Sequence, residues 1–405
     1  MNRYLLAGSA VVALALGAGS ANAQGKFEVR MGGDAVFEAH FLDQDRDTNA
    51  RGSEFADRFR LNITAVAKAD NGLEYGGRIR IRSMAGTGGN NATNVDRAYI
   101  HVGGGFGTVR MGTTNSYSDE NGSVYWPIAF QTGPLLLNNQ GVLSAGAVNT
   151  GTNTSTATSA SNVSAITTTL TPYSNTDNGN ATKIVYFSPR FTGFQLGASY
   201  TPRATSSGFD VSRTDNDNAL SDVWELGLNY SGEFSGVGVK ASVGYMGGTY
   251  ADSGIAYASQ LEDYGAWQGG LSVSYAGFTL GGGYLNKGES GQRKSFRNQD
   301  DFVTWGVGAQ YATGPLTVGV SFTRGEGVVD PTNSRVLTGV STTTTAGVTR
   351  YTGSVEQDQW AIGALYAVAP GLVVGAEYNY IDADAPGTAY DDKANVFILR
   401  SALIF

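Results

Sequence analysis

The sequence predicts an all-β fold: a closed, transmembrane, antiparallel barrel of about sixteen strands. Three observations lead to this expectation. Apolar and polar residues alternate one by one in many segments, and the connections between these segments are alternately short and long. After the N-terminal residues, no stretch approaches the roughly 20 apolar residues that a membrane-spanning helix needs. Glycine, at 57 of 405 residues, falls within the alternating segments and therefore belongs to strands rather than to a linker.

The alternation is clearest in residues 76–83, GGRIRIRS. Successive side chains of a strand point to opposite faces, so Arg78, Arg80 and Arg82 share one face and the isoleucines between them share the other. A soluble fold would bury the isoleucines in a core, and this segment alone does not exclude that. In a membrane, an arginine on the lipid face costs about 2–4 kcal/mol near the midplane. We therefore expect the arginines to face a water-filled lumen and the isoleucines to face lipid.

Sixteen alternating segments can be marked along the chain. They cover residues 26–41, 54–68, 73–84, 96–102, 106–112, 182–188, 194–203, 222–231, 237–248, 264–275, 278–286, 301–312, 315–324, 355–368, 371–382 and 395–405. Outer-membrane barrels have short periplasmic turns at one rim and long extracellular loops at the other, which is the order of connections found here. Tyrosines near both ends of the segments predict two interfacial belts.

The first tight turn, Asp70-Asn71-Gly72, allows a prediction of strand register. With Gly72 in a left-handed conformation, paired residues have numbers that sum to 142. Arg60 then lies opposite Arg82, and Asn62 lies opposite Arg80. Like charges opposite one another are unfavourable unless carboxylates or water face them. The arginines are therefore expected to line an aqueous pore with acidic groups opposite.

The N-terminus resembles a secretory signal peptide. Arg3 precedes an apolar stretch from Leu5 to Gly17, and Ala21-Asn22-Ala23 is a small-residue processing site. We expect residues 1–23 to be removed and residues 24–405 to form the barrel. The chain has no cysteine, which excludes disulfides, and its formal net charge of −8 argues against a nucleic-acid partner.

Two segments and the C-terminal residue carry a family resemblance. They are DRAYIHVGGGFGTVRMG (residues 96–112), KIVYFSPRFTGFQLGASY (residues 183–200) and Phe405. On these the chain resembles the general porins of Gram-negative bacteria over its mature length. The resemblance implies a trimer of sixteen-stranded barrels in the outer membrane, in contact with its lipid and lipopolysaccharide. It also implies passive diffusion of ions and small hydrophilic solutes, and insertion by the barrel-assembly machinery, which reads a terminal aromatic such as Phe405.

In such porins the third long loop folds into the barrel, and its carboxylates face arginines on the wall. The corresponding loop here, residues 113–181, contains Asp119 and Glu120. Its stretch 141–180 is rich in Ser, Thr, Asn, Ala and Gly, which leaves open which part enters the pore. The candidate wall residues are Arg58, Arg60, Arg78, Arg80, Arg82, Arg97 and Arg110.

One acidic loop matches part of a calcium-binding pattern. Asp43, Asp45, Asp47 and Glu54 occupy positions 1, 3, 5 and 12, but Thr48 replaces the required glycine. A solvated acidic loop is the favoured interpretation, and a weak Ca²⁺ site that bridges to lipopolysaccharide is the alternative. Otherwise no cofactor is expected.

Catalysis is not expected, because the chain has two histidines, His40 and His101, and no cysteine. The favoured function is a diffusion channel whose selectivity comes from pore width and lining charge. The alternatives are a substrate-selective channel, a non-channel barrel acting as an adhesin or enzyme, and a soluble exported β-protein.

Overall fold

The fold is that of a computed structural model of the chain. It describes residues 26–45, 51–85, 91–122, 181–204, 208, 219–251, 260–292, 294, 296–297, 301–327, 341–345, 348–352, 355–384 and 391–405. The expected signal peptide, residues 1–23, lies outside these ranges and stays a prediction. No helix of the described residues is long and apolar enough to cross a membrane.

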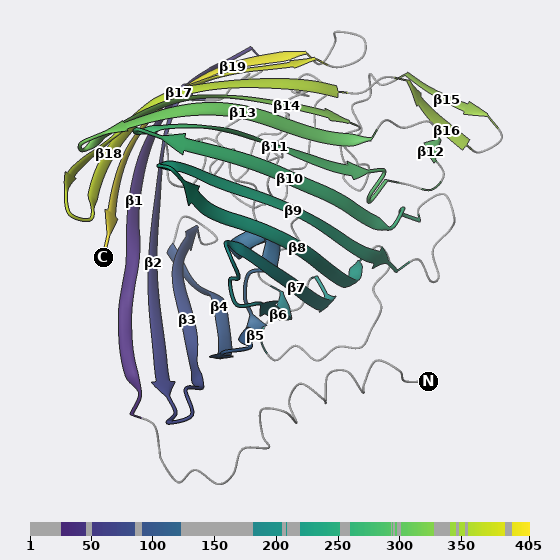
Figure 1. Cartoon of the computed structure of the whole chain (residues 1–405). Helices are drawn as coiled ribbons and strands as arrows, with labels where there is room; N and C mark the ends of the chain where they lie inside the picture. The colour runs from purple at the N-terminus through teal and green to yellow at the C-terminus, as the bar shows by residue number, and fades with distance from the viewer. Residues whose placement is uncertain are drawn as a thin grey trace, which may run out of the picture.

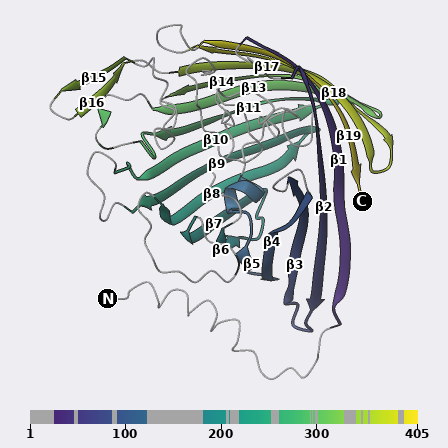
Figure 2. The same ribbon diagram turned by 180° about the vertical axis from the view of Figure 1, so that it is seen from behind.

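Sixteen antiparallel strands close into one barrel (Figures 1 and 2). In the first half they are β1 (Glu28–Gln44), β2 (Ser53–Lys68), β3 (Glu74–Ala85), β4 (Asn91–Gly104), β5 (Gly107–Thr113), β6 (Thr182–Phe187), β7 (Phe194–Arg203) and β8 (Leu220–Phe234). In the second half they are β9 (Val237–Tyr250), β10 (Tyr264–Tyr275), β11 (Phe278–Gly288), β13 (Phe302–Thr313), β14 (Leu316–Gly327), β17 (Val355–Ala369), β18 (Leu372–Asp384) and β19 (Asp392–Ile404). Each predicted segment corresponds to one of these strands, so the predicted barrel is confirmed.

Three further strands form a small separate sheet. They are β12 (Phe296–Arg297), β15 (Ser341–Thr345) and β16 (Val348–Thr352), in the order β12-β16-β15. The small sheet lies beside the barrel, at the opposite side from the C-terminus in Figure 1. The sequence analysis treated these segments as polar loops, because they lack an alternating apolar face. The β-branched threonines of β15 favour an extended backbone without such a face.

The lengths of the connections between strands distinguish the two rims of the barrel. Strand pairs β2–β3, β4–β5, β6–β7, β8–β9, β10–β11, β13–β14 and β17–β18 are joined by short turns at one rim, here called the short-turn end. Gly72 has φ 85°, and β2 pairs with β3 through Arg60↔Arg82 and Asn62↔Arg80, as predicted. At Ala276 and Gly277, φ is 48° and 86°, so both central residues are left-handed and the turn matches the strand twist.

The apolar faces of the strands form the outside of the barrel. Ile79 is 36% exposed and Ile100 is 55% exposed on this surface. Aromatic residues gather near both rims. At the long-loop end the rings of Tyr245 and Trp267 are 4.5 Å apart, and at the short-turn end those of Phe278 and Tyr311 are 4.4 Å apart. The two predicted belts are therefore present, as membrane interfaces require.

The C-terminal residue closes the barrel against the first strand. The amide of Phe405 donates to the carbonyl of Gly33 at 3.1 Å, and the amide of Gly33 donates to the carbonyl of Phe405 at 2.7 Å. The Phe405 ring lies 5.9 Å from that of Phe59 on β2. The last residue thus continues the β1–β19 ladder, which leaves no free edge at this position.

Candidate functional site

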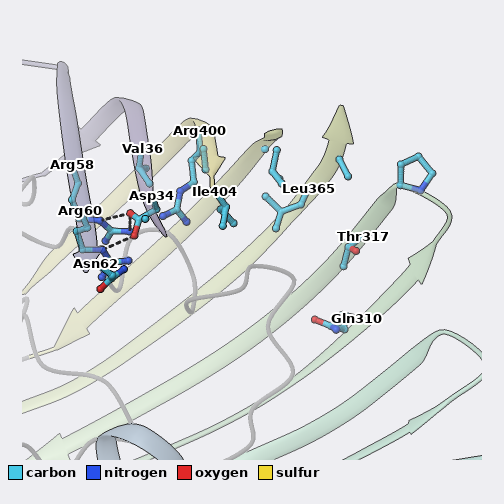
Figure 3. A pocket seen from close by; sticks show the side chains of 16 residues that line it. Asp34, Val36, Arg58, Arg60, Asn62, Gln310, Thr317, Leu365, Arg400 and Ile404 are labelled. Carbon is cyan, nitrogen blue, oxygen red and sulfur yellow. Dashed lines mark hydrogen bonds and ion pairs between the residues drawn. The ribbon is translucent and has the colours of Figure 1, made fainter. Parts of the chain in front are cut away.

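Arginines of β2 share a carboxylate that projects from β1. Asp34 accepts hydrogen bonds from Arg58 at 3.0 and 3.1 Å and from Arg60 Nε at 2.6 Å. Figure 3 shows the two guanidinium groups gathered around this carboxylate. Because β1 and β2 are paired as Asp34↔Arg60 and Val36↔Arg58, all of these side chains lie on the inner face.

A second carboxylate, that of Asp96, forms ion pairs with arginines of β3. Asp96 of β4 accepts from Arg80 Nε at 2.6 Å and from Arg80 Nη2 at 2.8 Å, and Arg82 Nη1 lies 3.6 Å from it. Strict alternation would place Asp96 and its neighbour Arg97 on opposite faces. The β3–β4 register shifts at this point, pairing Arg80 with Arg97 and Ile81 with Val95. This bulge leaves Asp96 unpaired and turns its carboxylate toward the lumen arginines.

Two further arginines of the wall, Arg78 and Arg97, have neutral or backbone hydrogen-bond partners. Arg78 donates to Asn62 Oδ1 at 2.6 Å, and Arg97 donates to the carbonyl of Asp96 at 2.7 Å. Both strands project these groups to the same face as Arg80. The arginines at positions 58, 60, 78, 80 and 97 therefore form one continuous basic surface inside β2, β3 and β4.

The third long loop begins inside the barrel. A short π-helix, η2 (Ser118–Gly122), follows β5. Glu120 Oε1 lies 2.8 Å from Arg110 Nη1, and Asn115 donates to the other oxygen of Glu120 at 3.1 Å. Asp119 and Glu120 also act electrostatically on Arg97. The start of the loop thus brings carboxylates to the arginine wall.

Tyr117 anchors this start of the loop to the neighbouring strands β6, β7 and β8. Its side chain is fully buried against Val185 and Phe187 of β6. The hydroxyl donates to the carbonyl of Gln195 at 3.1 Å and accepts from Asn229 at 2.8 Å. The ring lies over Gly197 and Gly227, which are partners in the β7–β8 ladder, and a Cβ at either glycine would overlap it. The two glycines therefore leave the space that the Tyr117 ring occupies, which is here called its seat.

The rest of the inner wall differs in charge from β2–β5. Its buried lumen-facing side chains include two carboxylates, Glu225 and Glu377, and a larger group of neutral polar residues: Asn229, Ser242, Gln268, Thr304, Gln359 and Asn379. The backbone amide of Ser118 donates to Glu225 at 3.1 Å. Arg324 of β14, by contrast, lies on the outer face, two residues from Phe322 and paired with Asp358 at 2.6 Å. The arginines are thus concentrated on one side of the lumen.

The structure places all seven predicted arginines on one side of the inner wall, and of these it brings Arg110 and Arg97 near the loop carboxylates Asp119 and Glu120. Whether these residues form the narrowest part of the pore stays a prediction. The sequence analysis missed Asp34 and Asp96 as ion-pair partners, and it missed Tyr117. Asp34 could have been found from the alternation of β1, which puts even-numbered residues on the inner face. Asp96 could not, because the bulge breaks the alternation at that residue. The stretch 141–180 lies outside the described residues.

The calcium-loop residues do not gather in the part of the chain that the structure describes. Within that part no group of three or more His, Cys, Asp or Glu side chains could hold a metal ion. Asp43 is paired with Asn395 at the strand end, and Glu54 forms an ion pair with Arg51. Asp47 lies outside the described residues, so the weak Ca²⁺ site stays a prediction.

Comparison with known proteins agrees with this architecture. The family model for Gram-negative porins matches residues 10–386. Among solved structures, the trimer form of in-vitro folded OmpT of Vibrio cholerae superposes with a TM-score of 0.57 at 13% identity, covering 94% of this chain and 99% of that chain. A variant of the Rh. blastica porin superposes with a TM-score of 0.51 at 16% identity, covering 93% of this chain and 100% of that chain. A search of curated proteins finds no match.

A closed antiparallel barrel with an apolar, aromatic-belted exterior and a charged interior defines a transmembrane β-barrel channel. The chain belongs to the Gram-negative porin family. It is an outer-membrane porin that forms a channel for passive diffusion.

Proposed function

We propose that the selectivity of this channel is set by its arginine wall against the carboxylates of the wall and the third loop. The central band is defined here by eight guanidinium groups, those of the seven predicted arginines and Arg400, and by the lumen carboxylates near them. These carboxylates are Asp34, Glu38, Asp96, Asp119, Glu120, Glu225 and Glu377, so the named side chains carry an excess of one positive charge. This excess carries the proposal. Fixed charges around a water-filled path raise the local concentration of counter-ions, so small anions pass more readily than cations of equal size.

The same arrangement gives a transverse field. Arginines lie on β2–β5, whereas Glu225 on β8 and Glu377 on β18 each lie three strands beyond an edge of that wall. The buried lumen-facing residues between these two strands, such as Gln268 and Thr304, are neutral and polar. A dipolar solute crossing this band is oriented by the field, while water and the neutral amide and hydroxyl groups replace part of its hydration. No covalent step is required for this transport, and we propose that the protein is not an enzyme.

A homotrimer in contact with outer-membrane lipid and lipopolysaccharide is the proposed assembly. It is supported by membership in the porin family and by the similarity to the trimer form of OmpT. We also propose that the barrel-assembly machinery reads Phe405, which is 52% exposed on the outer surface at the end of β19.

Reconstitution of the purified protein in planar bilayers tests the proposed function. Stepwise conductance increments that scale with bulk salt, together with a reversal potential of the sign for anion preference in a KCl gradient, are expected. A protein that inserts into the bilayer without conductance would favour the adhesin or enzyme alternative. A conducting protein that prefers cations would contradict the role assigned to the arginine wall.

A further inference from the structure

A cavity of about 490 Å³ lies in the lumen wall at the short-turn end (Figure 3). Its lining comes from β1, β2, β13, β14, β17, β18 and β19. One side carries Asp34 with Arg58 and Arg60, and the other side carries apolar groups that include Leu365 and Ile404. An apolar surface inside a polar channel contributes nothing to the passage of small inorganic ions, so it calls for another explanation.

The strand register places these residues side by side in rows that run across neighbouring strands. One row runs across five strands as Arg58, Val36, Ala402, Val373 and Ala367. Neighbouring strands are about 4.8 Å apart, so the four apolar members of this row extend over roughly 14 Å. A guanidinium group thus stands at the head of an apolar strip long enough for a single aromatic ring or a short branched chain.

The adjacent row also runs from charged side chains at one end to an apolar side chain at the other. It runs from Glu38 and Arg400 through Gly375 to Leu365. A Cβ at Gly375 would overlap Leu365 Cδ2, so the glycine allows the leucine side chain to lie across β18 toward Arg400. Figure 3 shows Arg400 and Ile404 between the Asp34 cluster and Leu365. The cation of Arg400 on β19 and the apolar side chain of Leu365 on β17 are therefore only two strands apart.

The charges at this site favour an anion. Asp34 pairs with Arg58 and Arg60, and Glu38 lies 3.3 Å from Arg400. Three guanidinium groups and two carboxylates give these five side chains a net charge of +1. The side chains of Arg58 and Arg60 are about one-quarter exposed, so water and solutes can reach their guanidinium groups, whereas that of Arg400 is 10% exposed and contributes mainly its charge.

We propose that this cavity is a binding subsite for amphiphilic monocarboxylates, with the carboxylate at Arg58, attracted also by the charge of Arg400, and the apolar body on Val373 and Leu365. The proposal rests on the proposed channel function and specifies a solute class for it. Contact of an aromatic ring or branched chain with the strip adds hydrophobic binding to charge attraction, whereas acetate gains the charge attraction alone. The subsite thereby retains such solutes during passage.

The test compares block of KCl conductance by benzoate, acetate and neutral benzamide in single-channel recordings. We expect benzoate to reach half-block at a concentration about fivefold below that of acetate, and benzamide to block more weakly than benzoate. Leu365→Ser should raise the half-blocking concentration of benzoate toward that of acetate, with each reading normalised to the variant's own KCl conductance. Val373→Thr, which changes shape little, provides the second variant should Leu365→Ser fail to assemble.

Val66→Ser is the matched control, because Val66 has the inner-face parity of β2 but does not line the cavity. It should leave the ratio of benzoate to acetate block unchanged. Equal block by benzoate and acetate in a conducting channel would overturn the subsite. An unchanged ratio in both Leu365→Ser and Val373→Thr would also overturn it. Absence of any conductance would instead contradict the channel function, so the two failures are distinguishable.

Discussion

Arg80 and Asp96 form a two-point ion pair across β3 and β4, with Nε–Oδ1 at 2.6 Å and Nη2–Oδ2 at 2.8 Å. The carboxylate is 1% exposed and also faces Arg82 at 3.6 Å. The acid that offsets the arginines of β3 therefore comes from the wall itself. This relationship, rather than a loop carboxylate alone, sets the charge at the centre of the basic surface.

Neutralising this acid should change both selectivity and stability. In Asp96→Asn, the guanidinium groups of Arg80 and Arg82 lose their nearest negative charge, so the reversal potential in a KCl gradient should move further toward anion preference. The lost charged hydrogen bonds should lower the free energy of unfolding by about 2 kcal/mol, measured by urea titration in phospholipid vesicles. A reversal potential equal to that of the unsubstituted channel would place Asp96 away from the ion path.

Removing one wall cation should have the opposite effect on selectivity. Arg80→Gln takes a positive charge from the lumen, and the channel should become less selective for anions. Arg324→Gln is a matched control, because Arg324 also pairs with an aspartate but lies on the outer face. Equal shifts of reversal potential in the two variants would contradict the assignment of faces.

Loosening the loop anchor should widen the pore. Tyr117→Ala removes the ring from its seat on Gly197 and Gly227, which should cost about 3 kcal/mol of stability and raise single-channel conductance. Tyr117→Phe keeps the ring and loses only the two hydrogen bonds of the hydroxyl, so it should cost about 1 kcal/mol and leave conductance nearly unchanged. A conductance in Tyr117→Ala equal to that of Tyr117→Phe would show that this part of the loop does not restrict flow.

The contact between loop and wall can be measured as a coupling. Arg110 and Glu120 are 21% and 29% exposed, so a double-mutant cycle of Arg110→Gln and Glu120→Gln should give a modest interaction energy of about 0.5–1 kcal/mol. Glu120→Gln alone should increase anion preference. Additive effects of the two changes on stability would mean that the ion pair contributes nothing measurable.

The periodic features of the fold could be predicted from sequence, because each depends on a local rule. The alternation around Arg80 gives the strand two faces, and the preference of arginine for water decides which face lines the lumen. The left-handed Gly72 in the turn gives the register of β2 and β3. Asp96 could not be placed in this way, since a bulge breaks the rule at that residue. Tyr117 could not be assigned either, because its seat is formed by glycines about 80 and 110 residues away in the chain.

The most direct test of the central claim is cysteine-scanning accessibility along β3, in a chain that has no native cysteine. Single variants Arg78→Cys, Ile79→Cys, Arg80→Cys and Ile81→Cys are reconstituted and treated with a charged, membrane-impermeant methanethiosulfonate reagent during conductance recording. Reaction with a change of current is expected at positions 78 and 80, and no reaction is expected at 79 and 81. Modification of 79 and 81 with protection of 78 and 80 would contradict an arginine-lined channel.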